Sequence, residues 1–356
     1  MKKIYLKGLN SYRAIAALIV IVGHTEMFKQ EYGFENFLNL DFFKFTGQHT
    51  AVILFFALSG FLITILLLKE REDCNTINLK KFYLRRIFRV WPLFYLVLIL
   101  SLILLNYSPS ITTTVLCFTI FPNVAHTLKI GWTASPQVWS IGVEEQFYLG
   151  WPWLFKIKKH LLTVFVFLFF FFALLPHFLS PLLSHFVASA KLNSFLGEFF
   201  YGTKFHCMAA GGIFALLYHQ KHWLINWLNR NIIVSYFFLL LPFALWFSAV
   251  HIPFFTDEMY AALFAISILI ISTHPNIIDI DYAIPNYLGK ISFGLYMYHW
   301  IILELIFRNN LLQIHNKAYF NVALYGLVLS ITIVISALSY HFIEKKFLNA
   351  KEKFSS

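Results

Sequence analysis

The stretch SYRAIAALIVIVGHTE, residues 11–26, predicts an apolar helix with a guanidinium near one end and an imidazole near the other. Arg13 and His24 are eleven positions apart, so at about 100° per residue they project from one face. The rise between them is about 16 Å, roughly half the hydrocarbon thickness of a bilayer. Because a charge facing lipid is costly, we expect both groups to face a polar interior. The alternatives are a membrane-end anchor for Arg13 and a hydrogen-bonded interfacial histidine for His24.

The rest of the 356-residue chain is also apolar: 59% of its residues are hydrophobic and 13% are charged, against about 25% charged in a soluble domain. We therefore expect an all-α polytopic membrane protein. Residues 1–348 are expected to form one integral-membrane domain and residues 349–356 a short basic cytoplasmic tail. The net charge of +11 does not indicate a nucleic-acid partner, because the basic residues sit mainly between apolar runs, as the positive-inside rule predicts.

The basic runs also predict the topology. They place both termini in the cytoplasm, since cytoplasmic loops carry an excess of lysine and arginine. Residues 108–137 contain an apolar run too short to span, which we expect to be re-entrant or to lie on the outer surface. The prediction is about ten transmembrane helices, at residues 10–27, 49–68, 91–106, 138–155, 161–179, 205–220, 231–250, 258–273, 288–308 and 319–342.

The cysteines Cys74, Cys117 and Cys207 are scattered and odd in number. They predict neither a disulfide framework nor a zinc site. We therefore expect no metal centre.

Three arginines, Arg85, Arg86 and Arg89, immediately precede Trp91 and Pro92 on the expected cytoplasmic side. Their i,i+3 and i,i+4 spacings place them on one side of a helix. Arginine makes bidentate, charge-assisted contacts with phosphate, so the cluster suits a phosphate-bearing ligand. The alternative is an orientation signal that contacts anionic lipid.

The run VWSIGVEEQFYLGWP, residues 138–152, places two adjacent carboxylates at the outer end of a predicted span. Glu144 and Glu145 diverge by about 100° on a helix, so at most one of them faces a given cavity. Ser140 and Tyr148 lie four residues to either side of Glu144 and extend a polar stripe. The alternative is an interfacial aromatic belt with hydrated carboxylates.

Two further runs carry polar residues inside predicted helices. In GKISFGLYMYHWIILELIFR, residues 289–308, His299 lies near mid-membrane and is a candidate functional residue, although histidines also pack helices together. Glu304 and Arg308 have i,i+4 spacing and can pair. The run LSGF, residues 58–61, contains small residues that let helices approach closely, so it indicates packing.

Taken together and in their order along the chain, these motifs resemble those of the membrane-bound acyltransferase-3 family. They are Arg-x10-His, SGF, Arg-x-x-Arg, WSxxVEEQFY, YxYHW and YHFIEKKF, and the resemblance runs from about residue 7 to 348. Proteins of this family move acyl groups, most often acetyl, from a cytoplasmic coenzyme A thioester to hydroxyls of surface glycans and related acceptors. The resemblance implies a stand-alone membrane domain in the bacterial cytoplasmic membrane, with acetyl-CoA as donor and a glycan or lipid-linked saccharide as acceptor.

Residue roles follow from that resemblance together with the patterns above. The donor-binding candidates are Arg13, Arg85, Arg86 and Arg89, and the catalytic candidates are His24, Glu144, Glu145, His299 and Tyr298. His24 is expected to act as general base or to carry the acyl group covalently. Glu144 or Glu145 would orient it. His299 or Tyr298 would stabilise the developing oxyanion.

A proton-coupled transporter or flippase of a glycolipid or small solute is the alternative function. Intramembrane histidine and glutamate serve proton relays equally well. A transporter needs no arginine cluster at its cytoplasmic end, and a membrane scaffold does not account for so many polar groups inside spans. Consumption of acetyl-CoA separates the enzyme from the transporter.

Overall fold

The computed structural model describes residues 6–37, 47–157, 159–184, 189–312, 314 and 316–352, and the regular structure in these ranges is entirely helical. The helices are α1 (Leu9–Glu31), α2 (Gly47–Cys74), α3 (Leu79–Leu104), α4 (Ile111–Phe118), α5 (Pro122–Thr127), α6 (Val138–Leu154), α7 (Leu161–Ser184), α8 (Ala190–Thr203), α9 (Phe205–His219), α10 (Trp223–Arg230), α11 (Ile232–Phe247), α12 (Thr256–Thr273), α13 (Ala283–Lys290), α14 (Ser292–Arg308), α15 (Lys317–Ser339), a π-helical turn (Tyr340–Glu344) and α16 (Lys345–Glu352).

Helix α2 is the central element and packs against α1, α9 and α12. Its apolar residues are buried along most of its length. A Cβ on Gly60 would overlap the carbonyl oxygen of Met208, and one on Gly211 would overlap that of Ala57. Glycine therefore permits the close contact between α2 and α9, which confirms the packing interpretation at Gly60.

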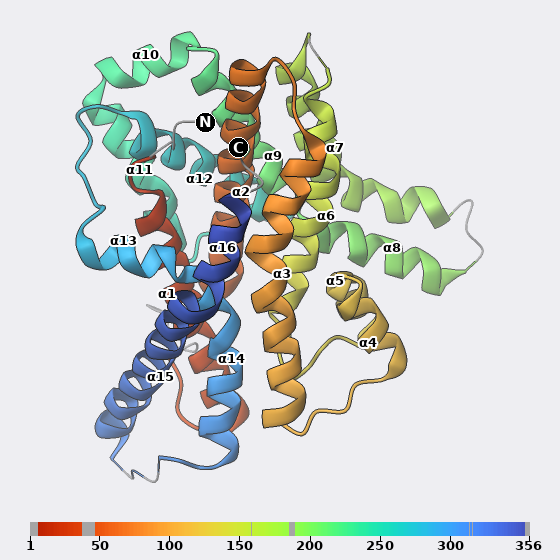
Figure 1. Cartoon of the computed structure of the whole chain (residues 1–356), viewed down its shortest axis with the longest axis vertical. Helices are drawn as coiled ribbons and strands as arrows, with labels where there is room; N and C mark the ends of the chain where they lie inside the picture. Colours follow the sequence, from red (N-terminus) through yellow and green to blue (C-terminus); the bar gives the residue numbers. More distant parts are fainter. Residues whose placement is uncertain are drawn as a thin grey trace.

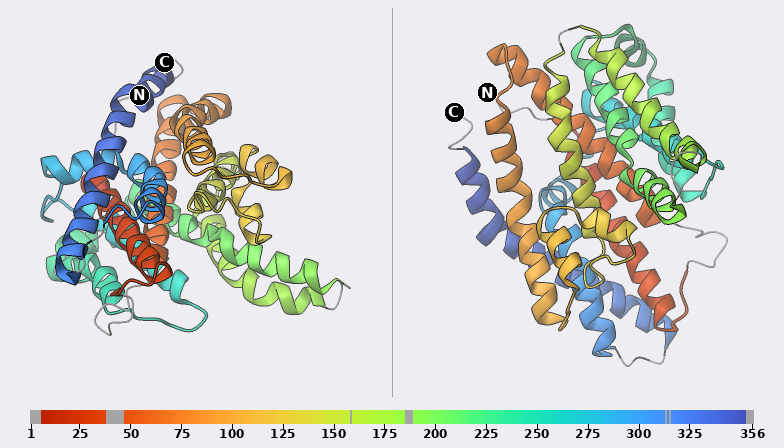
Figure 2. Two further views of the ribbon diagram at one scale, coloured as in Figure 1. Left: turned by 90° about the horizontal axis from the view of Figure 1, so that it is seen from below. Right: turned by 90° about the vertical axis from the view of Figure 1, so that its right-hand side faces the viewer.

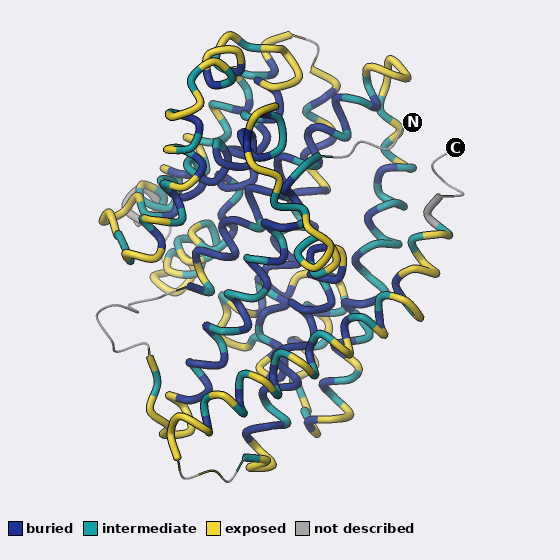
Figure 3. The backbone as a smooth tube through the Cα atoms, turned by 90° about the vertical axis from the view of Figure 1, so that its left-hand side faces the viewer, coloured by how far each residue is buried: buried dark blue, intermediate teal, exposed yellow. Residues whose placement is uncertain are grey.

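The helices form an elongated bundle (Figures 1 and 2). Figure 1 places α10 at one end of the bundle and the lower parts of α14 and α15 at the other. Helices α7 and α8 form a hairpin that projects from one side, close to the short helices α4 and α5 (Figures 1 and 2). Buried positions follow the centre of the bundle, whereas exposed positions gather at its ends and periphery (Figure 3).

Five helical segments of the described ranges are long and apolar enough to cross a membrane: Gly47–Cys74, Leu79–Leu104, Leu161–Leu179, Thr256–Thr273 and Lys317–Ala350. The pairs α10–α11 and α13–α14 bend by 101° and 70°, which gives up to seven spans if each pair is one span. The ten-span count and the orientation of the termini are therefore not confirmed. Helices α1, α6 and α9 coincide with expected spans but are not among these candidates.

One segment differs in detail from the expected pattern, and another agrees with it. Helix α3 begins at Leu79, capped by the Asn78 side chain that accepts from Lys81 N at 3.0 Å, so the arginine cluster lies inside the helix rather than before it. Residues 108–137 contain the short helices α4 and α5, of eight and six residues. At 1.5 Å per residue neither can cross a bilayer, as expected of this segment.

Candidate active site

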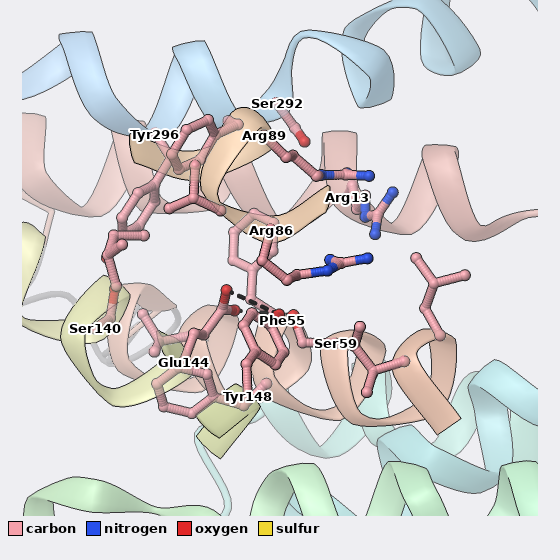
Figure 4. Close-up of a pocket in the computed structure, with 17 residues that line it drawn as sticks. Arg13, Phe55, Ser59, Arg86, Arg89, Ser140, Glu144, Tyr148, Ser292 and Tyr296 are labelled. Atoms are coloured by element: carbon pink, nitrogen blue, oxygen red, sulfur yellow. Dashed lines mark hydrogen bonds between the residues drawn. The ribbon is translucent and has the colours of Figure 1, made fainter. Parts of the chain in front are cut away.

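One cavity collects many of the polar side chains singled out in the sequence. It lies between α1, α2, α3, α6 and α14 and has a volume of about 770 Å³, part of it open to solvent. The polar residues that line it are Arg13, Ser59, Arg86, Arg89, Ser140, Glu144, Tyr148, Ser292 and Tyr296 (Figure 4). We call it the arginine cavity.

Three guanidinium groups point toward the same end of this cavity (Figure 4). Arg13 comes from α1, while Arg86 and Arg89 come from successive turns of α3. Arg86 is only 8% exposed, and its guanidinium lies 5.4 Å from the ring centre of Tyr148 and 5.8 Å from that of Phe82. Aromatic faces attract cations, so these rings help to hold Arg86 in place.

None of these three arginines forms an ion pair with a carboxylate of the described residues. In addition, the buried Nε of Arg86 has no hydrogen-bond partner in this part of the chain. Buried charges without partners are costly, and a bound anion removes that cost. The cavity is therefore suited to a polyanionic ligand.

Arg85, the remaining member of the cluster, lies outside the cavity. Its Nη2 donates to Glu70 Oε2 at 2.5 Å, and Glu70 Oε1 accepts from the backbone N–H of Asn78 at 2.9 Å. Neighbouring residues diverge by about 100° around a helix, so Arg85 and Arg86 face different surroundings. Arg85 joins the end of α2 to the start of α3.

The two glutamates separate as helix geometry predicts. Glu144 lines the cavity and accepts hydrogen bonds from Ser59 Oγ at 2.9 Å and Tyr148 Oη at 3.2 Å. Glu145 is buried on another face of α6 and accepts from Trp91 Nε1 at 2.9 Å. Of the pair, only Glu144 is positioned to contact a ligand in the arginine cavity.

The two candidate histidines meet across α1 and α14. His24 Nδ1 and His299 Nε2 are 2.8 Å apart and hydrogen-bonded, with their rings parallel. The Trp300 ring packs edge-on against His24, 5.0 Å between centres. Because one of these nitrogens must donate and the other accept, the contact couples the tautomers of the two imidazoles. Within the described chain His24 is thus oriented by His299, and no hydrogen bond joins it to either glutamate.

Tyr296 lies between the histidine pair and the arginine cavity. Its ring centre is 5.9 Å from that of His299, and the side chain also lines the cavity. The Tyr296 hydroxyl is 2.8 Å from Ser140 Oγ and donates to the Gln137 carbonyl at 3.1 Å. Tyr298, the tyrosine singled out in the sequence, instead donates to Ser339 Oγ at 2.9 Å on α15.

Sequence reasoning missed three polar cavity residues, Ser59, Ser292 and Tyr296. Ser59 was assigned to packing with Gly60, yet its hydroxyl bonds Glu144 while Gly60 meets α9. Tyr296 stands in the same YxYHW run as Tyr298. The two tyrosines differ only in the face of the helix from which they project. Among the described residues, no group of three histidine, cysteine or acidic side chains is arranged to hold a metal ion.

Long apolar helices that surround a buried polar cavity define an integral membrane protein. The chain belongs to the acyltransferase-3 family: the family model, described as an acyltransferase domain, matches residues 6–341. Its bacterial relatives place it in the bacterial inner membrane.

Three relatives illustrate the similarity. The chain is 26% identical over 378 residues to "Putative peptidoglycan O-acetyltransferase YrhL" of Bacillus subtilis, with 96% of this chain and 54% of that protein covered. It is 26% identical over 373 residues to a "Putative O-acetyltransferase" of Staphylococcus aureus, with 96% and 57% covered. It is 31% identical over 163 residues to "Peptidoglycan O-acetyltransferase OatA" of Listeria monocytogenes, with 42% and 24% covered. The chain spans about half the length of the first two relatives. No solved structure matches.

Proposed function

We propose that this protein is an O-acyltransferase that moves an acetyl or other short acyl group from cytoplasmic acyl-CoA to a hydroxyl of a surface or lipid-linked glycan. The observation that carries the proposal is the arginine cavity, where Arg13, Arg86 and Arg89 form no ion pair with a carboxylate of the described residues. The names of the relatives favour a glycan of the peptidoglycan type as acceptor.

Coenzyme A suits the arginine cavity chemically. It carries a diphosphate and a further phosphate, and arginine binds phosphate oxygens in bidentate fashion. With the phosphates at the arginines, the pantetheine arm extends past Glu144 towards Ser140 and Tyr296, which line the same cavity. The thioester then lies near the Tyr296 side chain, on the side of the cavity closest to His299.

Acyl transfer requires a base for the acceptor hydroxyl. In our proposal His24 takes that proton while the hydroxyl oxygen forms a bond to the thioester carbonyl carbon. The carbon–sulfur bond then breaks, and the proton passes from His24 to the departing coenzyme A sulfur. His299 positions His24 through the 2.8 Å hydrogen bond. The hydroxyl of Ser140 or Tyr296 would stabilise the oxyanion by turning its single proton from the Gln137 carbonyl to the substrate.

The proposal is tested with purified protein in detergent, acetyl-CoA and a soluble oligosaccharide. We expect release of free coenzyme A that depends on both the protein and the oligosaccharide. A transporter or flippase binds without consuming thioester. Saturable acetyl-CoA binding is also expected, and a protein that neither binds nor consumes acetyl-CoA would exclude the proposed donor.

A further inference from the structure

A second cavity lies at the opposite ends of α2 and α6 from the arginines. It has a volume of about 740 Å³, part of it open to solvent, and is lined by α5, α8 and the first turns of α2 and α6. The lining residues that matter here are His49, Asn123, His126, Lys129, Trp139 and Glu198. We call it the outer groove, and the mechanism above makes no use of it.

Buried side chains of opposite charge hold the residues on one side of the groove in place. Asp257 accepts from His49 Nε2 at 3.0 Å and forms an ion pair with Lys204 through its other oxygen. Lys204 and Asp257 are 3% and 7% exposed, whereas the His49 side chain is 46% exposed. The network holds the His49 ring by one nitrogen and leaves the other at the groove surface.

Lys204 joins α8 to α9 with φ 45°, in the left-handed region. Other residues that follow helices of this chain, such as Asn75 and Asn310, adopt the same region, which is a common way to end a helix. The buried ion pair with Asp257 holds the Lys204 side chain at this connection.

An aromatic and amide wall forms the opposite side. The half-buried Trp139 ring lies nearly parallel to that of His126, with centres 5.8 Å apart. Asn123 and Gln146 exchange two amide hydrogen bonds of 3.0 and 2.7 Å, which orient the Asn123 side chain. This wall combines a flat apolar face with polar groups in fixed orientations.

The rim of the groove carries an exposed pair of opposite charges. Lys129 and Glu198 form an ion pair of 2.6 Å, with side chains 76% and 46% exposed. The hydrogen bond from Lys129 lowers the pKa of the Glu198 carboxyl, so that group is ionised at neutral pH. An exposed pair of this kind contributes little stability and opens readily.

We propose that the outer groove binds the saccharide part of the acceptor, specifically a neutral N-acetylated oligosaccharide. Tryptophan stacks on the apolar face of a sugar ring, while amides and imidazoles bond its hydroxyl and acetamido groups. The charges that line the groove are paired, Lys129 with Glu198 of the lining and Lys204 with the buried Asp257, so the groove favours a neutral ligand over a phosphate.

The position of the groove fits this role, which rests on the proposed function. Trp139 is adjacent in sequence to Ser140 of the arginine cavity, and its ring packs edge-on against Phe56, which also lines that cavity. At this point the packed side chains of Trp139 and Phe56 separate the groove from the cavity assigned to the acyl donor.

The test measures binding of triacetylchitotriose, a soluble neutral oligosaccharide, to purified protein by titration calorimetry without any acyl-CoA. We expect Trp139→Ala and His49→Ala to weaken binding at least tenfold and Trp139→Phe, which keeps an aromatic face, to restore part of it. Trp153→Ala is the matched control, because this half-exposed tryptophan lies at the other end of α6. It should bind as the wild type does.

Coenzyme A affinity is measured on the same preparations and should stay within twofold of the wild-type value in every variant. Retained coenzyme A binding shows that each variant is folded. Wild-type affinity for the trisaccharide in both alanine variants overturns the groove assignment, as does a wild type that does not bind the trisaccharide. If the trisaccharide binds as expected but no acetyl-CoA is consumed, the proposed function fails while the groove assignment stands.

Discussion

Arg86→Ala gives the sharpest perturbation of the donor site. The guanidinium is buried, stands over the Tyr148 and Phe82 rings and has an unpartnered Nε among the described residues. A charge-assisted hydrogen bond contributes about 1.5–3 kcal/mol, and about 1.4 kcal/mol is a tenfold change in Kd, so coenzyme A binding should weaken roughly 10- to 150-fold. The rings already hold the side chain, so little rotamer entropy is lost on binding, and we expect the upper half of that range.

The matched control is Arg85→Ala, which removes the same charge one residue earlier. Arg85 bonds Glu70 outside the cavity, so its loss should lower the melting temperature while changing coenzyme A affinity less than threefold. Titration calorimetry on monodisperse protein measures both affinities. Equal losses of affinity in the two variants would mean that only the general positive charge of α3 matters, and unchanged affinity in Arg86→Ala would refute the site.

Two further predictions concern catalysis and packing. His24→Ala should lower the rate of acyl transfer by about 10²–10⁴-fold, because it removes the general base. Coenzyme A affinity should stay unchanged. Loss of coenzyme A binding would instead make His24 a binding residue and His299 the better candidate base. Gly60→Ala should lower the melting temperature, because its Cβ meets the carbonyl oxygen of Met208, whereas the control Gly326→Ala has nothing within 4 Å of the added atom. Equal melting temperatures for the two glycine variants would contradict the packing of α2 on α9.

The sequence predicts the helical architecture well, because long apolar runs have few alternatives in a membrane. Helices α1, α2, α6 and α9 begin within two residues of the expected positions. The bends between α10 and α11 and between α13 and α14 depend on tertiary packing, and the hydropathy pattern carries no signal for them. Helix α8 lies in a segment for which no helix was expected.

The sequence predicts the relative positions of site residues that lie on the same helix. It does not predict contacts between residues on helices that are far apart in the sequence. The divergence of Glu144 and Glu145 follows from the helical period alone. The partner of Arg85 could not be read from spacing, since Glu70 reaches it across the connection between α2 and α3. The contact of His24 with His299 joins residues 275 positions apart, and only the packing of α1 on α14 reveals it.

The central claim is that an acyl group leaves acyl-CoA and becomes an ester on a saccharide through His24. The most direct measurement incubates purified wild-type and His24→Ala protein with isotope-labelled acetyl-CoA and an N-acetylated oligosaccharide, and then analyses the saccharide by mass spectrometry. The account predicts a labelled, base-labile acetyl ester with the wild type and at least 100-fold less with the variant, in line with the roughly 10²–10⁴-fold effect of a general base. Unlabelled saccharide from active wild-type preparations that bind both ligands, or equal labelling by the two proteins, would contradict it.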